Sequence, residues 1–380
     1  MAAAQLSSVA DVTVGGNNTM EWNKFFRSNL VPVVAYKPGL REEQIRQLVE
    51  GNTIYKLSSN ESPLPPFPSA IEAMQKHLVN LNEYPEGSCH QLARLLAEHY
   101  GVFPEQITVG NGSNELVDLI AMTCLEPGDN AVYCWPSFVV YRSSAQIAGA
   151  EPREIPLDAD GSFNLNAMLD AIDEKTKIAY ICTPNNPTGP TVSTAKFEAF
   201  MAQVPEHVLV VVDAAYEEFV DDEQAMKPLR YFDGKKPYAV LRTFSKAYAL
   251  AGLRCGYGIA PAALVEMINK VREPFNVNTL SQVAAEACFG DTAELQKRVA
   301  LNATGRALLQ QHFAKLGLKA FHSQANFIWV EVSDVGTVFD ALLKKGIIVR
   351  TFPGTQGLRV GVGDEAGVAA TMAAFTDLFG

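Results

Sequence analysis

One short stretch of the chain places two cations among small and apolar residues. It reads TFSKAYALAGLR (243–254), and Lys246 and Arg254 are its charged residues. A lysine withdrawn from water near a second cation has a lowered pKa, and its neutral amine is then a nucleophile. Arginine can grip a phosphate with two parallel hydrogen bonds. The ordinary alternatives are a lysine extending to the surface and an arginine in a surface salt bridge.

The elements that must position these side chains follow from the apolar pattern. Short runs without polar alternation indicate strands covered on both faces, as in a mostly parallel sheet. Helical periodicity lies between them, for example over 114–124. This is typical of an α/β chain with a doubly wound sheet. The expected strands are 107–110, 130–134, 177–183, 208–213, 238–243 and 256–260.

After Pro261 the pattern changes to a smaller α+β domain. Its expected helices cover 261–272, 278–289, 292–316 and 335–345, and its expected strands are 326–332, 346–350 and 357–362. The predicted organisation is a disordered leader over 1–20, an N-terminal arm and part of the small domain over 21–54, a large domain over 55–275, and a small C-terminal domain over 276–380. The first residues lack the pattern of a signal peptide, and Met20 is an alternative start.

Composition narrows the possible partners. Among 380 residues the net charge is −11, which argues against nucleic acid or an anionic membrane surface as a partner. The sequence contains no apolar run long enough for a membrane helix. The six cysteines form no C-x-x-C motif and the histidines form no H-E-x-x-H motif, so we expect reduced thiols, a cytoplasmic protein and no metal site.

Polar residues follow the expected strands at their carboxyl ends, where doubly wound sheets bind ligands. Ser113 and Asn114 open a helix after 107–110, which suits a phosphate or is an ordinary helix cap. Asn186 belongs to the turn-forming sequence PNNPTG after 177–183. Asp213 ends a strand and precedes Tyr216, so that its carboxylate either caps a helix or holds a cationic ring nitrogen.

Two further arginines complete the set. Arg350 and Arg359 lie at or within apolar strands near the C-terminus, where a guanidinium needs an anionic partner. A phosphate site, a nucleophilic lysine, an aspartate for a ring nitrogen and arginines for an anionic substrate together indicate pyridoxal 5'-phosphate as cofactor.

Several motifs then resemble a known family. They are SSNESPLP, EYPEG, PNNPTG, VVDAAYEEF, RTFSKAYALAGLRCGY and GLRVGVG, and the resemblance covers about residues 30–380. This resembles the histidinol-phosphate aminotransferase branch of the fold-type-I pyridoxal-phosphate enzymes. The resemblance implies a large domain with a mostly parallel doubly wound sheet and a smaller α+β domain.

The resemblance also implies roles for individual residues. Lys246 would form a Schiff base with the cofactor and move a proton between it and the substrate Cα, with Asp213 on the ring nitrogen. Asn186 and Tyr216 would contact the ring hydroxyl, and Phe138 would stack on the ring. The implied ligands of the cofactor phosphate are Ser113, Asn114, Ser245 and Arg254.

Substrate and subunit contacts follow in the same way. Tyr84 resembles the tyrosine that reaches the cofactor phosphate of a partner subunit, which implies a homodimer with shared active sites. The implied substrate-binding residues are Tyr36, Asn60, Arg350 and Arg359. Two positions depart from the family pattern. Ala214 replaces a glutamate that is not a cofactor contact, and Ser62 replaces an asparagine at the rim of the pocket.

The expected reaction is transamination between L-histidinol phosphate and 2-oxoglutarate, in histidine biosynthesis. An aromatic-amino-acid aminotransferase on the same scaffold is the nearest alternative, because its pocket also binds a planar ring and an anion. A phosphothreonine decarboxylase uses the same cofactor to break a different bond. A non-catalytic regulatory domain would need a DNA-binding module, and the roughly twenty residues before the fold are too few for one.

Overall fold

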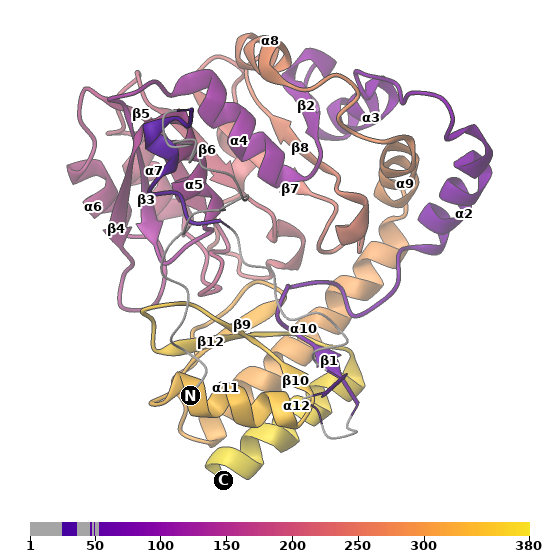
Figure 1. Ribbon diagram of the computed structural model, residues 1–380, viewed down its shortest axis with the longest axis vertical. Coiled ribbons are helices and arrows are strands. Elements are labelled where there is room, and N and C mark those ends of the chain that lie inside the picture. The colour runs from indigo at the N-terminus through magenta and orange to yellow at the C-terminus, as the bar shows by residue number, and fades with distance from the viewer. Residues whose placement is uncertain (1–24, 36–45, 48, 50–52) are drawn as a thin grey trace, which may run out of the picture.

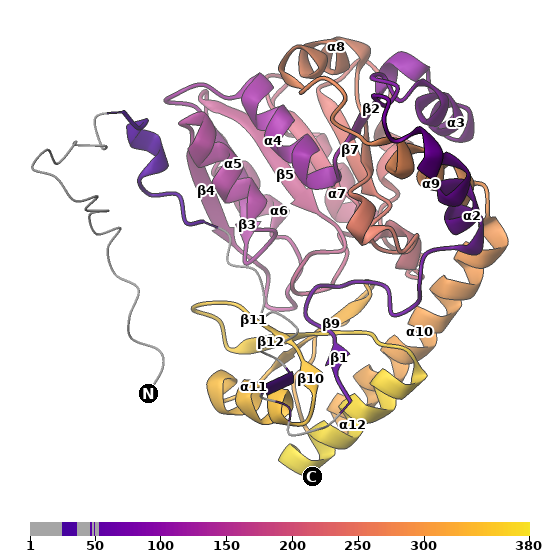
Figure 2. The same ribbon diagram turned by 45° about the vertical axis from the view of Figure 1, so that its right-hand side comes forward.

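The computed structural model describes residues 25–35, 46–47, 49 and 53–380. The expected leader over 1–20 and the predicted substrate residue Tyr36 lie outside these residues. The described chain has a large part built around one sheet, drawn at the top of Figure 1, and a smaller part below it. The 24-residue helix α10 (Thr292–Lys315) runs from the first part into the second (Figures 1 and 2).

Among the described residues, seven strands form the large sheet in the order β2-β8-β7-β6-β5-β3-β4. Strand β8 runs antiparallel to both neighbours, and every other pair is parallel. All residues of the three strands β6, β7 and β8 are buried, which confirms a sheet covered on both faces. The strands are β2 Ile107–Gly110, β3 Asn130–Trp135, β4 Glu151–Pro156, β5 Thr176–Cys182, β6 Leu209–Asp213, β7 Tyr238–Thr243 and β8 Gly256–Ile259.

The sequence pattern missed one strand of this sheet. Strand β4 lies at the edge and none of its residues is buried, so its sequence EPREIP carries no continuous apolar run. The other six strands agree with the predicted ranges within one residue at either end. The doubly wound α/β fold predicted from the sequence is therefore confirmed.

Helices surround the sheet, and Figure 2 shows α4 and α5 in front of it. Apolar residues of α4, α5, α6, α7 and α8 join the strands in one buried cluster. A second cluster packs α2, α3 and α9 beside strands β2 and β8. Helices α8 and α9, which the sequence pattern assigned to the smaller domain, therefore pack with the large part. The helices of this part are α2 Pro68–His77, α3 His90–Tyr100, α4 Ser113–Cys124, α5 Val140–Ala148, α6 Leu165–Asp170, α7 Thr194–Met201, α8 Ala262–Val271 and α9 Thr279–Phe289.

The smaller part has its own apolar cluster between α10, two other helices and short strands. Strands β11, β12 and β9 form an antiparallel sheet, and β1 pairs with β10 in parallel. The elements are β1 Tyr55–Lys56, β9 Phe327–Glu331, β10 Ile347–Ile348, β11 Arg350–Thr351, β12 Gly357–Gly361, α11 Val335–Lys344 and α12 Glu365–Phe379. The short 3₁₀ helix η2 (Ser28–Leu30) contacts α5 of the large part. The domain limits at residues 54 and 275 stay predictions.

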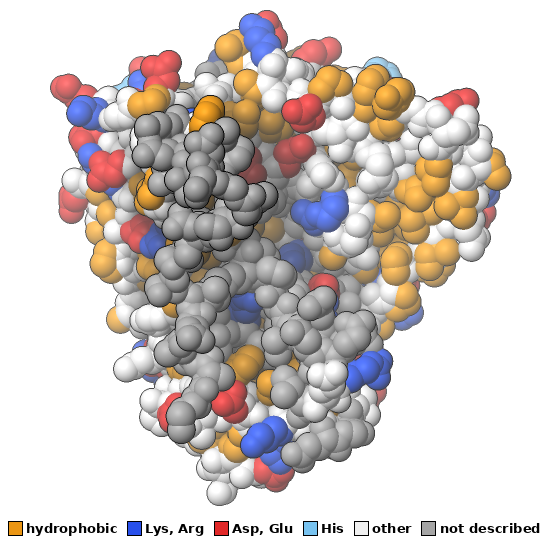
Figure 3. Space-filling model, in the orientation of Figure 1, with side chains coloured by type: hydrophobic (Ala, Val, Ile, Leu, Met, Phe, Trp, Pro, Cys, Tyr) orange, Lys and Arg blue, Asp and Glu red, His pale blue; other side chains and the backbone are white. Residues whose placement is uncertain are grey.

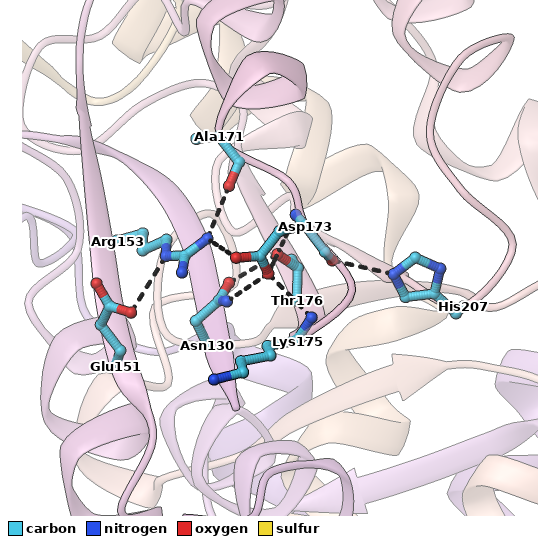
Figure 4. A network of polar contacts seen from close by, with 8 residues as sticks. All are labelled: Asn130, Glu151, Arg153, Ala171, Asp173, Lys175, Thr176 and His207. Atoms are coloured by element: carbon cyan, nitrogen blue, oxygen red, sulfur yellow. Dashed lines mark hydrogen bonds and ion pairs between the residues drawn. The ribbon is translucent and has the colours of Figure 1, made fainter. Parts of the chain in front are cut away.

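The amino ends of the parallel strands carry a closed polar network (Figure 4). Arg153 of β4 donates to Asp173 over 2.7 Å and to the carbonyl of Ala171 over 3.0 Å. Asn130, at the start of β3, donates to the other oxygen of Asp173 over 2.9 Å. These contacts hold the starts of three adjacent strands together and pair their polar groups with one another. The residues that do chemistry are therefore to be expected at the carboxyl ends of the strands.

None of the helices in the described part of the chain is long and apolar enough to cross a membrane.

Candidate active site

A cavity of about 350 Å³ opens at the carboxyl ends of the large sheet, where the smaller part faces it. Strands from both parts contribute side chains to its wall, including Asp213 at the end of β6 and Arg359 in β12. The structure therefore gathers residues that lie far apart in the sequence. The predicted residues that line the cavity are Asn60, Ser113, Asn114, Phe138, Asn186, Asp213, Tyr216, Ser245, Lys246, Arg254, Arg350 and Arg359.

Two predicted residues are not among those that line it. Tyr36 lies outside the described residues. Tyr84 lies on the surface with 83% of its area exposed, and its ring stacks on that of Phe275 at 4.8 Å between centroids. Within this single chain, Tyr84 therefore does not line the cavity.

Lys246 lies three residues beyond the end of β7 and lines the cavity. Its Nζ donates to the carbonyl of Ser59 over 3.2 Å. Burial and the nearby Arg359 guanidinium lower the pKa of Lys246 to about 8. At pH 7.5, about a quarter of such amines are neutral, compared with about one in a thousand for a lysine of ordinary pKa. This lysine can therefore act as a nucleophile and a base near neutral pH.

The amino end of α4 forms an anion site next to this lysine. Gly112 occupies its N-cap position with φ of 88°, and no side chain caps the helix there. The first N–H groups, on Ser113 and Asn114, therefore remain available to an anion, and the helix dipole favours one. Arg254 closes the site, and its Nη1 donates to the carbonyl of Ala251 over 3.1 Å and toward Ser245 Oγ over 3.4 Å.

Glycines make this close arrangement possible. A Cβ on Gly112 would lie 2.3 Å from a terminal guanidinium nitrogen of Arg254. A Cβ on Gly256, the first residue of β8, would lie 2.3 Å from the backbone nitrogen of Ser113. The contact at Gly256 is with backbone atoms, and Gly112 has a positive φ that other residues rarely adopt, so the anion site depends on these two glycines.

Asp213 presents a carboxylate with only 4% of its area exposed at the floor of the cavity. The hydroxyl of Tyr141 donates to its Oδ2 over 2.7 Å, and the backbone N–H of Ala215 donates to its Oδ1 over 3.2 Å. Burial raises the pKa of Asp213. A buried carboxylate is stable when a cation accompanies it, and a protonated ring nitrogen would supply that cation.

The two asparagines of PNNPTG have separate tasks. Asn186 faces the cavity, and its Oδ1 accepts a hydrogen bond of 2.5 Å from Arg359. Asn185 is fully buried, and its amide donates to Thr188 Oγ1 over 2.7 Å and to the carbonyl of Pro136 over 3.1 Å. The motif thus combines one residue of the cavity wall with one that holds two loops together.

Tyr216 and Asn60 join the two parts of the chain beside the cavity. Asn60 Nδ2 donates to the hydroxyl of Tyr216 over 3.0 Å, and Asn326 Nδ2 donates to the carbonyl of Asn60 over 3.0 Å. Asn60 has φ of 54°, a left-handed conformation that asparagine tolerates better than most residues. Burial raises the pKa of Tyr216, so its hydroxyl stays protonated and can donate a hydrogen bond.

Arg350 and Arg359 are the cavity-lining arginines of the smaller part. They occupy directly opposed positions of the antiparallel pair β11–β12, and both line the cavity. Arg359 Nη2 also donates to the carbonyl of Ser58 over 2.5 Å. Like charges at opposed positions destabilise a sheet, and an anion bound between them would relieve the repulsion.

Several residues that line the cavity, and Tyr141 behind its wall, were not predicted from the sequence. Tyr141, which holds Asp213, lies inside helix α5 and carried no motif. Ser59 and Glu61 stand on either side of the predicted Asn60, so that the adjacent motif SSNESP was a usable signal. The other lining residues not predicted are Ser58, Ser137, Val139, Cys182, Ala215, Thr243, Ala251 and Phe352.

The two positions that depart from the family pattern are adjacent in sequence to residues that line this cavity. Ala214 is fully buried behind the end of β6, and Ser62 lines a small neighbouring cavity instead. Neither residue is among those that line the main cavity in the described chain. The described residues also contain no group of three or more His, Cys, Asp or Glu side chains that could hold a metal ion.

The residues present fit pyridoxal phosphate. The open helix end with Arg254 suits its phosphate, Lys246 suits its aldehyde, and the buried carboxylate of Asp213 suits its basic ring nitrogen. Phe138, the ring neighbour of Tyr141 at 5.6 Å, offers an aromatic face in the same cavity.

Comparison with known proteins agrees with this geometry. Residues 52–375 match the family model for aminotransferases of class I and II. The chain belongs to the class I and II aminotransferases. A histidinol-phosphate aminotransferase from Halalkalibacterium halodurans is 40% identical over 358 residues, covering 93% of this chain and 96% of the relative. Histidinol-phosphate aminotransferase 2 from Pseudomonas aeruginosa is 43% identical, covering 88% and 91%.

A solved structure extends the likeness to three dimensions. The histidinol-phosphate aminotransferase of Sinorhizobium meliloti, crystallised in complex with pyridoxal-5'-phosphate, superposes with a TM-score of 0.85 at 25% identity. It covers 93% of this chain, and this chain covers 97% of it. Pyridoxal phosphate is therefore the cofactor of this aminotransferase, in agreement with the sequence prediction.

Gly256→Ala tests the anion site. The added Cβ must push the start of α4 away from β8, so we expect the dissociation constant for pyridoxal phosphate to rise at least about tenfold while the fold is kept. Binding is measured by fluorescence titration of the cofactor-free protein, and folding by far-UV circular dichroism. Gly252→Ala is the matched control, because a Cβ there meets nothing within 4 Å. Equal affinity in both variants would contradict this account.

The lowered pKa of Lys246 predicts a pH dependence. The neutral amine attacks the aldehyde, so the rate at which cofactor-free protein captures pyridoxal phosphate should rise with pH through about 8 and then level off. Arg359→Leu removes a neighbouring cation and should move this midpoint upward. Stopped-flow absorbance measures the rate. A midpoint near 10 in the unmodified protein would show that the lysine is not perturbed.

Proposed function

We propose that this protein transfers the amino group of L-histidinol phosphate to 2-oxoglutarate, giving imidazole acetol phosphate and L-glutamate in histidine biosynthesis. The relatives of 40% and 43% identity, which align over most of the chain, support this assignment. The observation that carries it is the opposed pair Arg350 and Arg359, which lines the same cavity as Lys246. A phosphate monoester and a carboxylate can bind in turn between the same two guanidinium groups.

Each end of the cofactor has its own residues. The N–H groups of Ser113 and Asn114, with Ser245 and Arg254, would hold the phosphate. Asp213 would keep the ring nitrogen protonated, and Tyr141 holds that carboxylate in place. The residues for the ring face and the ring hydroxyl are Phe138, Asn186 and Tyr216.

The lysine performs the proton transfer. Bound pyridoxal phosphate supplies an electron sink for the negative charge that forms when the substrate Cα loses its proton. Lys246 Nζ would take the proton from the substrate Cα. Its lowered pKa makes the neutral form abundant near pH 7.5, which a general base requires. The same amine would return the proton on the cofactor side.

We also propose that two copies of the chain share their active sites. Apolar side chains lie exposed around the 3₁₀ helix η3 (Leu78–Asn80) and the following loop, on the right of Figure 3. Such a patch favours a protein partner, and Tyr84 within it would reach the partner's cofactor phosphate. The exposed residues of this patch are Ile71, Leu78, Val79, Leu81, Tyr84 and Phe275.

A cytoplasmic location is part of the same proposal. All six cysteines are free thiols, and five of them are buried. A chain that keeps so many unpaired thiols suits a reducing compartment.

The donor is tested by spectral titration of the purified holoenzyme. L-Histidinol phosphate should abolish the visible absorbance band of the bound cofactor at low concentration, and 2-oxoglutarate should restore it. L-Phenylalanine should need at least about a hundredfold more, because it lacks the phosphate that the arginine pair receives. A stronger response to phenylalanine would instead identify an aromatic-amino-acid aminotransferase.

Shared sites predict complementation between two defective variants. Lys246→Ala and Tyr84→Ala each impair every site in their own homodimers. In a mixed dimer one site has both residues intact, so random exchange should restore up to about a quarter of the wild-type activity. The variants are co-refolded, and the native mass is measured by light scattering. A monomeric mass, or no gain above the two separate activities, would refute shared sites.

A further inference from the structure

One acidic residue that lines the cavity has no role in the proposed reaction so far. Among the described lining residues, the cations are Lys246, Arg254, Arg350 and Arg359. The acids are Asp213, at the floor, and Glu61. Asp213 is engaged by Tyr141 and suits the cofactor ring, whereas Glu61 belongs to a different segment of the wall.

Glu61 lies near the reacting centre. Two residues before it, the carbonyl of Ser59 accepts the hydrogen bond from Lys246 Nζ. Asn60 lies between them in a left-handed conformation. Its backbone carbonyl accepts a hydrogen bond from Asn326, and its side-chain amide donates one to Tyr216. The position of Glu61 is thus fixed by a buried neighbour. Its carboxylate also acts on Lys246, opposing the lowering of that pKa.

Glu61 lines this cavity and also a neighbouring one that Lys56 lines. Its side chain keeps 38% of its area exposed, and its nearest cation is Lys56 at 3.0 Å. Lys56 is itself more than half exposed, and an ion pair of this kind contributes little stability. Glu61 can therefore accept a further hydrogen bond from a ligand without losing a strong interaction.

We propose that Glu61 is a specificity-determining residue that accepts a hydrogen bond from the imidazole ring of the amino donor. This inference rests on the proposed function. Neutral imidazole always carries one N–H donor and imidazolium carries two, so a carboxylate suits either form. The same negative charge repels the donor's phosphate and directs it to Arg350 and Arg359.

The acceptor substrate makes no use of this contact. 2-Oxoglutarate and L-glutamate have no ring N–H that could donate to Glu61. Loss of the Glu61 acceptor should therefore raise KM only for histidinol phosphate, whereas an effect through the pKa of Lys246 would alter kcat in both half-reactions. A residue that merely supports the wall would affect both half-reactions.

The test compares Glu61→Gln and Glu61→Leu in the holoenzyme. Leucine removes the acceptor, so KM for L-histidinol phosphate should rise about tenfold or more, with kcat changed much less. Glutamine keeps an uncharged acceptor and should give a smaller rise. KM for L-glutamate should stay within about twofold in both variants. L-Phenylalaninol phosphate, which has a benzene ring in place of imidazole, should bind all three proteins alike.

Two controls separate this role from others. Lys56→Met removes the ion-pair partner of Glu61 and should leave or lower KM for histidinol phosphate. In a Lys246→Ala background, which cannot turn over, calorimetry should show the same loss of histidinol phosphate affinity when Glu61→Leu is added. A loss that is equal for phenylalaninol phosphate or glutamate would overturn the proposal, as would no loss for histidinol phosphate. If the wild-type enzyme converts glutamate but not histidinol phosphate, the proposed function itself fails.

Discussion

The site depends on an amine kept next to positive charge. Lys246 shares its cavity with three guanidinium groups, and burial together with Arg359 lowers its pKa to about 8. Cations gathered in this way repel one another, so the arrangement is costly unless anions bind among them. The helix end at Ser113 and the pair Arg350–Arg359 are the two places where anions fit. Binding of a phosphate cofactor and an anionic substrate relieves this repulsion, which increases the affinity for both.

The rest of the fold keeps these groups from separating. Asp213 and Lys246 follow adjacent parallel strands, β6 and β7, so that they emerge at the same edge of the sheet. Gly256 allows β8 to approach the first turn of α4, which places the helix N–H groups beside Arg254. At the opposite edge, the network around Asp173 pairs the strand starts with one another (Figure 4). The amino ends of the strands are therefore fixed by contacts within the protein, whereas their carboxyl ends line the cavity in which the chemistry takes place.

The smaller part completes the cavity from the other side. Arg359 lies in β12 and reaches Asn186 of the large part, and Asn326 reaches the carbonyl of Asn60. These contacts join residues that are more than 170 positions apart in the chain. The substrate end of the cavity therefore exists only when both parts are in contact. The cofactor end is built almost entirely from the large part.

What the sequence determined by itself was the fold and the residues that follow its strands. Buried strands are continuous apolar runs, and the polar residues after them must emerge at one edge, so Lys246, Asp213 and Asn186 were predictable. Strand β4 was not, because an edge strand has no fully covered face. Only the tertiary structure decided that Tyr141 holds Asp213 and that Glu61 belongs to the wall. Contacts of this kind depend on how helices and loops pack in space, which leaves no periodic mark along the chain.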